Sequence, residues 1–164
     1  MIPTDPDMTN AMEMFEIGSF LHANGDFKES ISYLRSALKL AEPQGDLETT
    51  WNILTNLGSA LGNTGEFDEA LYCFKEAIVI DRQRNNRKSE VTHLIKIGEI
   101  YLQQGDLVTG SEYAKIALSL LKQGIEKNVS ERKQIEIYFS NFLETLYHNM
   151  RSQNLIENFV ELLE

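Results

Sequence analysis

Cysteine and proline are scarce in this chain of 164 residues, and long apolar runs are missing. Cys73 is the only cysteine, so no internal disulfide can form and a reducing compartment, the cytoplasm, is expected. Three prolines leave room for long uninterrupted helices. No stretch is apolar enough to cross a bilayer, and Met1–Asp7 lacks the pattern of a secretory signal, so neither a membrane span nor a signal peptide is expected.

Positive charge is also in short supply. Fifteen Lys and Arg stand against twenty-five Asp and Glu, which gives a net charge of −10. Nucleic acid is therefore not an expected partner, because phosphate contacts need Lys and Arg. One basic cluster lies where a helix is expected to end, and cations are favoured at a helix C-terminus. We interpret it in that structural way; its members are Arg82, Arg84, Arg87 and Lys88.

Side chains for metal binding or catalysis do not gather in the sequence. His22, His93 and His148 lie far apart, with no second His or Cys at ligand spacing. Cys73 has an aromatic residue on each side and no histidine nearby, so it is predicted to be a small packed residue and not a nucleophile. We therefore expect no metal, no cofactor and no enzymatic activity.

The most prominent feature of the sequence is an internal repeat with a period of forty residues. In each unit a glycine is followed seven residues later by a second glycine, then by an acidic and an apolar residue, and ten residues further on by an alanine. A match of so many positions in three units is hard to obtain by chance. The repeated positions are Gly18, Gly58 and Gly98, then Gly25, Gly65 and Gly105, then Ala37, Ala77 and Ala117.

Each unit is predicted to be a helix, a tight turn and a second helix. Apolar residues recur at helical spacing on both sides of the second glycine. That glycine suits the left-handed residue that ends a helix, and the acids after it suit the first turn of the next helix. Neither helix can bury its apolar stripe alone, so the units must stack. In the second unit the two stripes are Leu54, Leu57, Leu61 and then Phe67, Leu71, Phe74, Ile78.

The first glycine of each unit is predicted to permit close helix packing. A glycine inside a helix costs about 1 kcal/mol relative to alanine, which points to a steric demand. Small residues on the second helix are expected to face these glycines: Ser30 opposite Gly18, Ala70 opposite Gly58 and Gly110 opposite Gly98.

The chain is thus predicted to be an all-α solenoid with eight helices and no strands. After residue 127 the register changes, and Leu143 replaces the glycine in a stripe that includes Phe139, Phe142 and Leu146. The expected divisions are a flexible segment at 1–9, repeats at 10–45, 46–86 and 87–127, and a degenerate fourth repeat or helical hairpin at 128–164.

This pattern resembles the tetratricopeptide repeat family, over about residues 10–127. The second unit matches best, at Leu54, Leu57-Gly58, Leu61, Ala70, Phe74 and Ala77, whereas the third has Ala114 where the family has an aromatic. The resemblance implies a right-handed superhelix whose first helices line an inner surface that binds protein segments. Forty residues exceed the family's usual period of about 34. The longer form is similar to repeats in kinesin light chains, spindle-orientation adaptors and bacterial peptide-pheromone receptors.

Candidate ligand-binding residues lie on the first helices, away from the predicted core. Three asparagines on one helix suggest binding, because Asn is a mediocre helix former and its carboxamide can both donate and accept hydrogen bonds. Related arrays carry an asparagine at the place of Asn56 that holds the main chain of the ligand. Ser59 lies on the same face. The predicted peptide-binding residues are Phe15, Ser19, His22, Asn52, Asn56, Asn63, Lys96, Glu99 and Gln103.

Some members of the family bind the C-terminal carboxylate of heat-shock chaperones through a clamp of two lysines, two asparagines and an arginine. Asn56 and Lys96 fall at clamp positions, but Phe15, Ser19 and Thr92 occupy the others. That ligand is therefore not expected.

The C-terminal residues form two neighbouring apolar stripes on one predicted helix. A helix that is apolar over most of its circumference is usually buried on more than one side, so self-association into a homodimer is expected. The alternative is that a longer fourth repeat folds back and covers these residues. The predicted self-association residues are Leu155, Ile156, Phe159, Val160 and Leu163.

The sequence therefore favours a cytoplasmic protein-interaction module, an adaptor or peptide sensor, whose partner is a protein or peptide. Two alternatives stay open at this point. The chain could be a secretion-type chaperone for a client protein, or the repeat portion of a larger signalling regulator.

Overall fold

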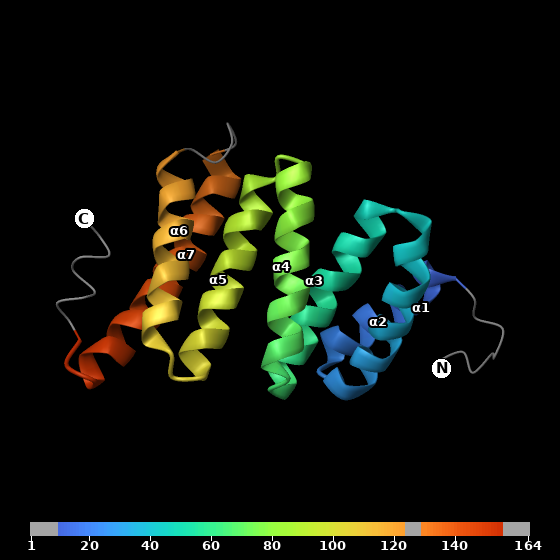
Figure 1. Cartoon of the computed structure of the whole chain (residues 1–164), viewed down its shortest axis with the longest axis horizontal. Helices are drawn as coiled ribbons and strands as arrows, with labels where there is room; N and C mark the ends of the chain where they lie inside the picture. Colours follow the sequence, from blue (N-terminus) through green and yellow to red (C-terminus); the bar gives the residue numbers. More distant parts are fainter. Residues whose placement is uncertain (1–9, 124–128, 156–164) are drawn as a thin grey trace. The chain divides into compact units, whose positions relative to one another are not determined.

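A computed structural model describes residues 10–123 and 129–155 of the chain (Figure 1). Within these residues it contains seven α-helices, one short 3-10 helix and no strand, which confirms the all-α prediction. The expected eighth helix falls mostly on residues outside the described ranges. The elements are α1 (Ala11–Asn24), α2 (Phe27–Ala41), η1 (Glu42–Gln44), α3 (Leu47–Thr64), α4 (Phe67–Gln83), α5 (Arg87–Gln103), α6 (Leu107–Lys122) and α7 (Val129–Ser152).

Two compact units make up the chain, and each has its own core. Unit 1 spans residues 1–80 and contains α1, α2, α3 and most of α4. Unit 2 spans residues 81–164 and contains the end of α4 with α5, α6 and α7. The helix pairs α1–α2, α3–α4 and α5–α6 lie inside the three expected repeats, whose exact limits stay predictions.

The turns inside the repeats lie where the glycine pattern places them. Gly25, Gly65 and Gly105 have φ angles of 85°, 83° and 80°, in the left-handed region that residues other than Gly rarely adopt. After Gly25 the Asp26 N–H donates to the Leu21 carbonyl, which closes the end of α1. These turns reverse the chain, so that each pair of helices packs side by side.

The turn between α4 and α5 uses asparagine in the same way, which the glycine pattern did not indicate. Asn85 has a φ of 53°, and the Asn86 N–H donates to the Asp81 carbonyl at 2.8 Å. Asparagine tolerates this conformation better than most side chains. The basic cluster around this turn is therefore not a single helix end. Arg82 lies in the last turn of α4, as expected, but Arg87 and Lys88 begin α5.

The interior glycines do permit close packing, and Ser30 faces Gly18 as predicted, since its Oγ donates to the Gly18 carbonyl at 2.7 Å. A Cβ on Gly58 would lie 3.0 Å from the Phe74 ring and 3.2 Å from Cys73 Cβ, and Ala70 is not among its nearest neighbours. On Gly18 it would meet Leu34 at 2.7 Å. The residue one turn further along the second helix, Leu34 or Phe74, thus fills the space over Gly18 and over Gly58, and the small residue at the start of that helix does not.

In the third repeat the space over the glycine is filled from a different helix. Ala114 takes the place of Leu34 and Phe74, and it is too small to reach Gly98. Phe142 of α7 occupies this space, with a ring carbon 2.6 Å from the position of a Cβ on Gly98. Gly110 is close to Gly98, as predicted, since a Cβ there would lie 3.4 Å from the Gly98 carbonyl oxygen.

We expect Gly58→Leu to lower the free energy of unfolding by about 1–3 kcal/mol, because the added side chain overlaps Phe74 and Cys73. Urea denaturation followed by the fluorescence of Trp51, on the same helix, measures the change. Gly62→Leu is the matched control, since nothing lies within 4 Å of a Cβ at Gly62. An unchanged midpoint for Gly58→Leu would disprove the packing argument.

Candidate interaction surface

Two hydrogen-bonded pairs join α1 to α3 within unit 1. The Asn56 Nδ2 group donates to Ser19 Oγ at 2.8 Å. One helical turn further on, His22 Nε2 lies 3.1 Å from Ser59 Oγ. All four side chains are half-buried. We call these four residues the α1–α3 polar surface.

The first pair retains hydrogen-bonding capacity of both kinds. Ser19 Oγ accepts from Asn56, so its hydroxyl proton can still be donated. The Oδ1 atom of Asn56 accepts no hydrogen bond from the residues that the structure describes. One free donor beside one free acceptor matches the N–H and C=O groups of a peptide backbone.

The second pair contains a histidine that favours its neutral form. Burial lowers the pKa of His22 below its usual value, because a charged ring loses the stabilisation of water. Its ring lies edge-on to Phe27, with ring centroids 5.4 Å apart. A neutral imidazole has one donor and one acceptor nitrogen, so the second pair also offers both functions.

The other predicted residues of unit 1 are not drawn into these pairs. Phe15 and Asn52 are half-buried on α1 and α3 and make no polar contact with the four residues above. Asn63 is exposed, and its Nδ2 group donates to the Ser59 carbonyl of its own helix at 2.9 Å.

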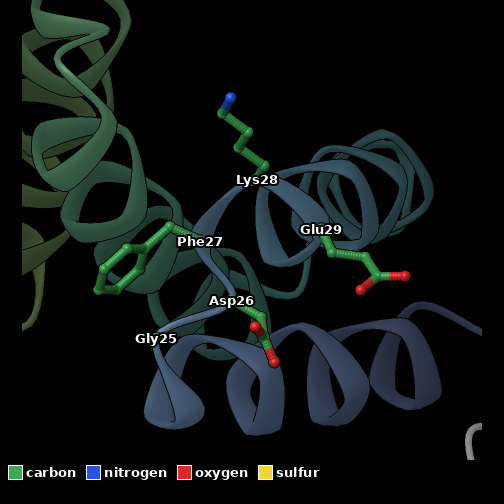
Figure 2. Close-up of a pocket in the computed structure, with 5 residues that line it drawn as sticks. All are labelled: Gly25, Asp26, Phe27, Lys28 and Glu29. Atoms are coloured by element: carbon green, nitrogen blue, oxygen red, sulfur yellow. The ribbon is translucent and has the colours of Figure 1, made fainter.

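A small hollow at the turn between α1 and α2 does not form a site. It is lined by Gly25 to Glu29. Figure 2 shows that the side chains of Asp26, Phe27, Lys28 and Glu29 point in different directions. No group of side chains converges there on a common point, so we assign it no ligand.

Unit 2 has a charged cluster between α5 and α7. Lys96 Nζ lies 3.1 Å from Glu99 Oε2, and the Tyr138 hydroxyl donates to the same oxygen at 3.2 Å. Lys96 also lies over the Tyr138 ring, 5.3 Å from its centre. Tyr138 was not among the predicted residues, because it belongs to the part of the sequence where the repeat register is lost. Gln103 is exposed at the end of α5 and takes no part.

The electrostatics of this cluster do not favour an anionic ligand. Burial tends to lower the pKa of Lys96, but Glu99 and Tyr138 outweigh it, so the pKa is raised and the lysine stays charged. Burial also raises the pKa of Tyr138 to about 12. The positive charge of Lys96 is therefore balanced by Glu99 in the free protein.

The described residues also bear on metal binding, membrane crossing and thiol chemistry. These residues contain no group of three or more side chains suited to a metal ion, and no helix long and apolar enough to cross a membrane. Cys73 is buried, as expected of a packed residue, and burial raises the pKa of its thiol to about 12. Such a thiol is a poor nucleophile at neutral pH.

Comparison with known proteins agrees with this geometry. Residues 8–83 match the sequence model of the tetratricopeptide repeat family. These residues are tetratricopeptide repeats. Tetratricopeptide repeats are generally protein-interaction modules, and that general function is the one the match supports. No curated protein matches the chain.

Solved tetratricopeptide structures extend the likeness beyond the matched residues. The chain is similar to the TPR domain of Arabidopsis FLU, with a TM-score of 0.61 and 17% identity over 70% of this chain and 96% of that one. It is also similar to a Podospora anserina protein described as a putative kinesin light chain with nearly identical TPR-like repeats, with a TM-score of 0.67 and 13% identity over 93% of this chain and 74% of that one. A single-residue variant of that protein gives a TM-score of 0.69. At these identities the shared property is the fold.

Proposed function

We propose that this protein is an adaptor or peptide sensor that binds a segment of another protein on the first helices of its repeats. The observation that carries the proposal is the α1–α3 polar surface. Its four side chains are held in place by each other and still have unused donors and acceptors. Side chains that are fixed before binding lose little conformational entropy when the ligand arrives.

A polypeptide segment fits this surface better than a small molecule or an ion. The free Ser19 hydroxyl and the free Asn56 carbonyl oxygen complement the alternating C=O and N–H groups of a peptide. Lys96, Glu99 and Tyr138 offer a second place of contact in unit 2. The proposed contact residues therefore include the predicted Phe15, Ser19, His22, Asn52, Asn56, Asn63, Lys96, Glu99 and Gln103, with Ser59 and Tyr138 added.

Asn56→Ala is expected to weaken binding about tenfold, because it removes hydrogen bonds worth roughly 0.5–1.5 kcal/mol each. The probe is a synthetic peptide selected on the wild-type protein from a phage-displayed library of random linear peptides, and affinity is measured by titration calorimetry. Asn149→Ala is the control, since among the described residues the Asn149 amide bonds the Thr145 carbonyl of its own helix, α7. Equal affinities for wild type and Asn56→Ala would place the binding surface elsewhere.

We further propose that the end of unit 2 associates with a second copy of the chain. A hollow on α6 and the end of α7 is lined in part by Leu107, Val108, Met150 and Leu155. Val108 is 62% exposed, which leaves apolar surface uncovered in the described part of unit 2. Leu155 is half-buried there, and the remaining predicted residues, Ile156, Phe159, Val160 and Leu163, lie outside the described ranges.

The wild-type protein is then expected to sediment as a dimer at micromolar concentration. A Phe159→Glu, Val160→Glu double variant should sediment as a monomer, because charges on the apolar stripes prevent their burial. Analytical ultracentrifugation over a range of concentrations measures both. A wild-type monomer at the highest concentration would rule out the dimer and favour intramolecular coverage of the stripes.

A further inference from the structure

The two buried or half-buried histidines of the protein have opposite surroundings. His93 is paired with a carboxylate, since its Nδ1 atom lies 2.7 Å from Asp81 Oδ2. His22 has the neutral Ser59 hydroxyl and the edge of the Phe27 ring. His93 thus has a carboxylate partner, whereas the polar and ring partners of His22 among the described residues are uncharged.

Among the described residues, the hydrogen-bond and ring contacts of His22 are with uncharged groups, and burial alone shifts its pKa. Figure 2 shows that Asp26, in the turn before α2, and Lys28 and Glu29, at the start of α2, point away from the Phe27 ring, which lies edge-on to His22. On α3, no residue from Thr49 to Thr64 is charged. On α1 itself, the acidic side chains of Glu13 and Glu16 are exposed and lie two turns or so before His22. The polar surface around His22 is therefore uncharged.

The unit that carries this uncharged surface is itself strongly acidic. Up to Ile80 the chain has thirteen acidic and four basic residues, whereas from Asp81 onward it has twelve and eleven. Almost all of the net charge of −10 thus belongs to unit 1. The long-range field of such a unit attracts cationic partners and repels anionic ones.

We propose that the α1–α3 polar surface is specific for a peptide of net positive charge whose residues over His22 are uncharged. This inference rests on the proposed function and adds the chemistry of the ligand. The acidic unit attracts the peptide over distance. Where the peptide touches the surface, Ser19, His22 and Asn56 bind its uncharged groups. An acidic side chain of the peptide would have no cation to pair with at these residues.

The sign of the pH dependence of binding follows from covering His22 with an uncharged segment. An uncharged segment that covers His22 removes its remaining water, so the bound state holds the proton less readily than the free state. Affinity is then constant above the ordinary pKa of histidine and falls as the pH drops below the pKa of His22 in the free protein, by at most about tenfold per pH unit. A ligand carboxylate over His22 would reverse the sign, because it would stabilise the protonated ring.

The test uses the whole chain and peptides selected at about pH 7.5 from the same phage-displayed library, which contains all charge types. We expect the selected sequences to be rich in Lys and Arg and poor in Asp and Glu. Calorimetry with a selected peptide that lacks histidine is expected to show weaker binding at about pH 5.5 than at about pH 7.5, by a factor of at most about ten. His22→Gln, which keeps a side chain able to bond Ser59, should remove most of this difference.

The outcomes separate this inference from the proposed function. Peptides that bind wild type and Asn56→Ala equally well would overturn the proposed function and the inference with it. Peptides that depend on Asn56 but are acidic, or that bind more tightly at the lower pH, would overturn the inference alone. Affinity that does not change with pH would also overturn it, as would a pH dependence that persists in His22→Gln.

Discussion

Replacing Phe142 by alanine is expected to lower the free energy of unfolding by about 3–5 kcal/mol, the usual cost of removing a buried phenylalanine ring. The Phe142 side chain is 2% exposed and fills the space over Gly98. The backbone of α5 cannot move in to fill the cavity without breaking its contacts with α6. A loss of this size is a large part of the stability of an ordinary domain.

Circular dichroism during urea denaturation measures the loss, and hydrogen exchange locates it. The only tryptophan, Trp51, belongs to unit 1, so its fluorescence does not report directly on α7. Amides of α5 and α7 should lose protection in Phe142→Ala. Phe20→Ala is the control, because Phe20 is 63% exposed and its removal leaves no cavity. A loss below about 1 kcal/mol would show that the cavity collapses or that the ring is not packed on Gly98.

A compensating substitution tests the packing more directly. Leu34 and Phe74 fill the space over Gly18 and Gly58 from within their own repeats. Ala114 occupies the equivalent place in the third repeat and is fully buried. Adding Ala114→Leu to Phe142→Ala should therefore restore part of the lost stability. In the wild-type background the same Ala114→Leu change should destabilise, because the space is already occupied.

The space over Gly98 is filled by Phe142 and not by a residue of the third repeat. This difference shows which contacts the sequence could and could not predict. The turns at Gly25, Gly65 and Gly105 were predictable, because a left-handed φ is a local demand that glycine meets best. The pairing of Phe142 with Gly98 was not, since it joins residues from different repeats after the forty-residue register has been lost. The departure of Ala114 from the family pattern was visible in the sequence, but not the residue that compensates for it.

For the candidate surface, too, the sequence predicted the residues but not the hydrogen bonds between them. Ser19, His22 and Asn56 were predicted as ligand-binding residues from their place on the first helices, and the structure brings them together with Ser59. That Asn56 would bond Ser19, and His22 would bond Ser59, depends on how far α3 is shifted along α1. This shift is set by side chains packed across the whole helix pair, which no local pattern reveals. Whether these residues bind a peptide stays a prediction.

The second large effect is expected at Asp81, whose replacement by alanine should lower the free energy of unfolding by about 1–3 kcal/mol. Asp81 and His93 are 1% and 2% exposed, and their atoms Oδ2 and Nδ1 lie 2.7 Å apart. Removing the carboxylate leaves a ring nitrogen of His93 without this acceptor in a place that water does not reach. A buried polar group that loses its partner keeps the cost of its desolvation.

Comparing the single and double variants separates the desolvation cost at His93 from the stabilising energy of the Asp81–His93 interaction. Asp81→Ala with His93→Leu should be more stable than Asp81→Ala alone, because an apolar side chain needs no acceptor. Thermal and urea unfolding of wild type, both single variants and the double variant give the coupling energy. Arg132→Ala is the control for loss of an exposed ion pair, here with Glu136, and should cost less than about 1 kcal/mol. If the two single losses simply add in the double variant, the Asp81–His93 pair does not stabilise the start of unit 2 as a pair.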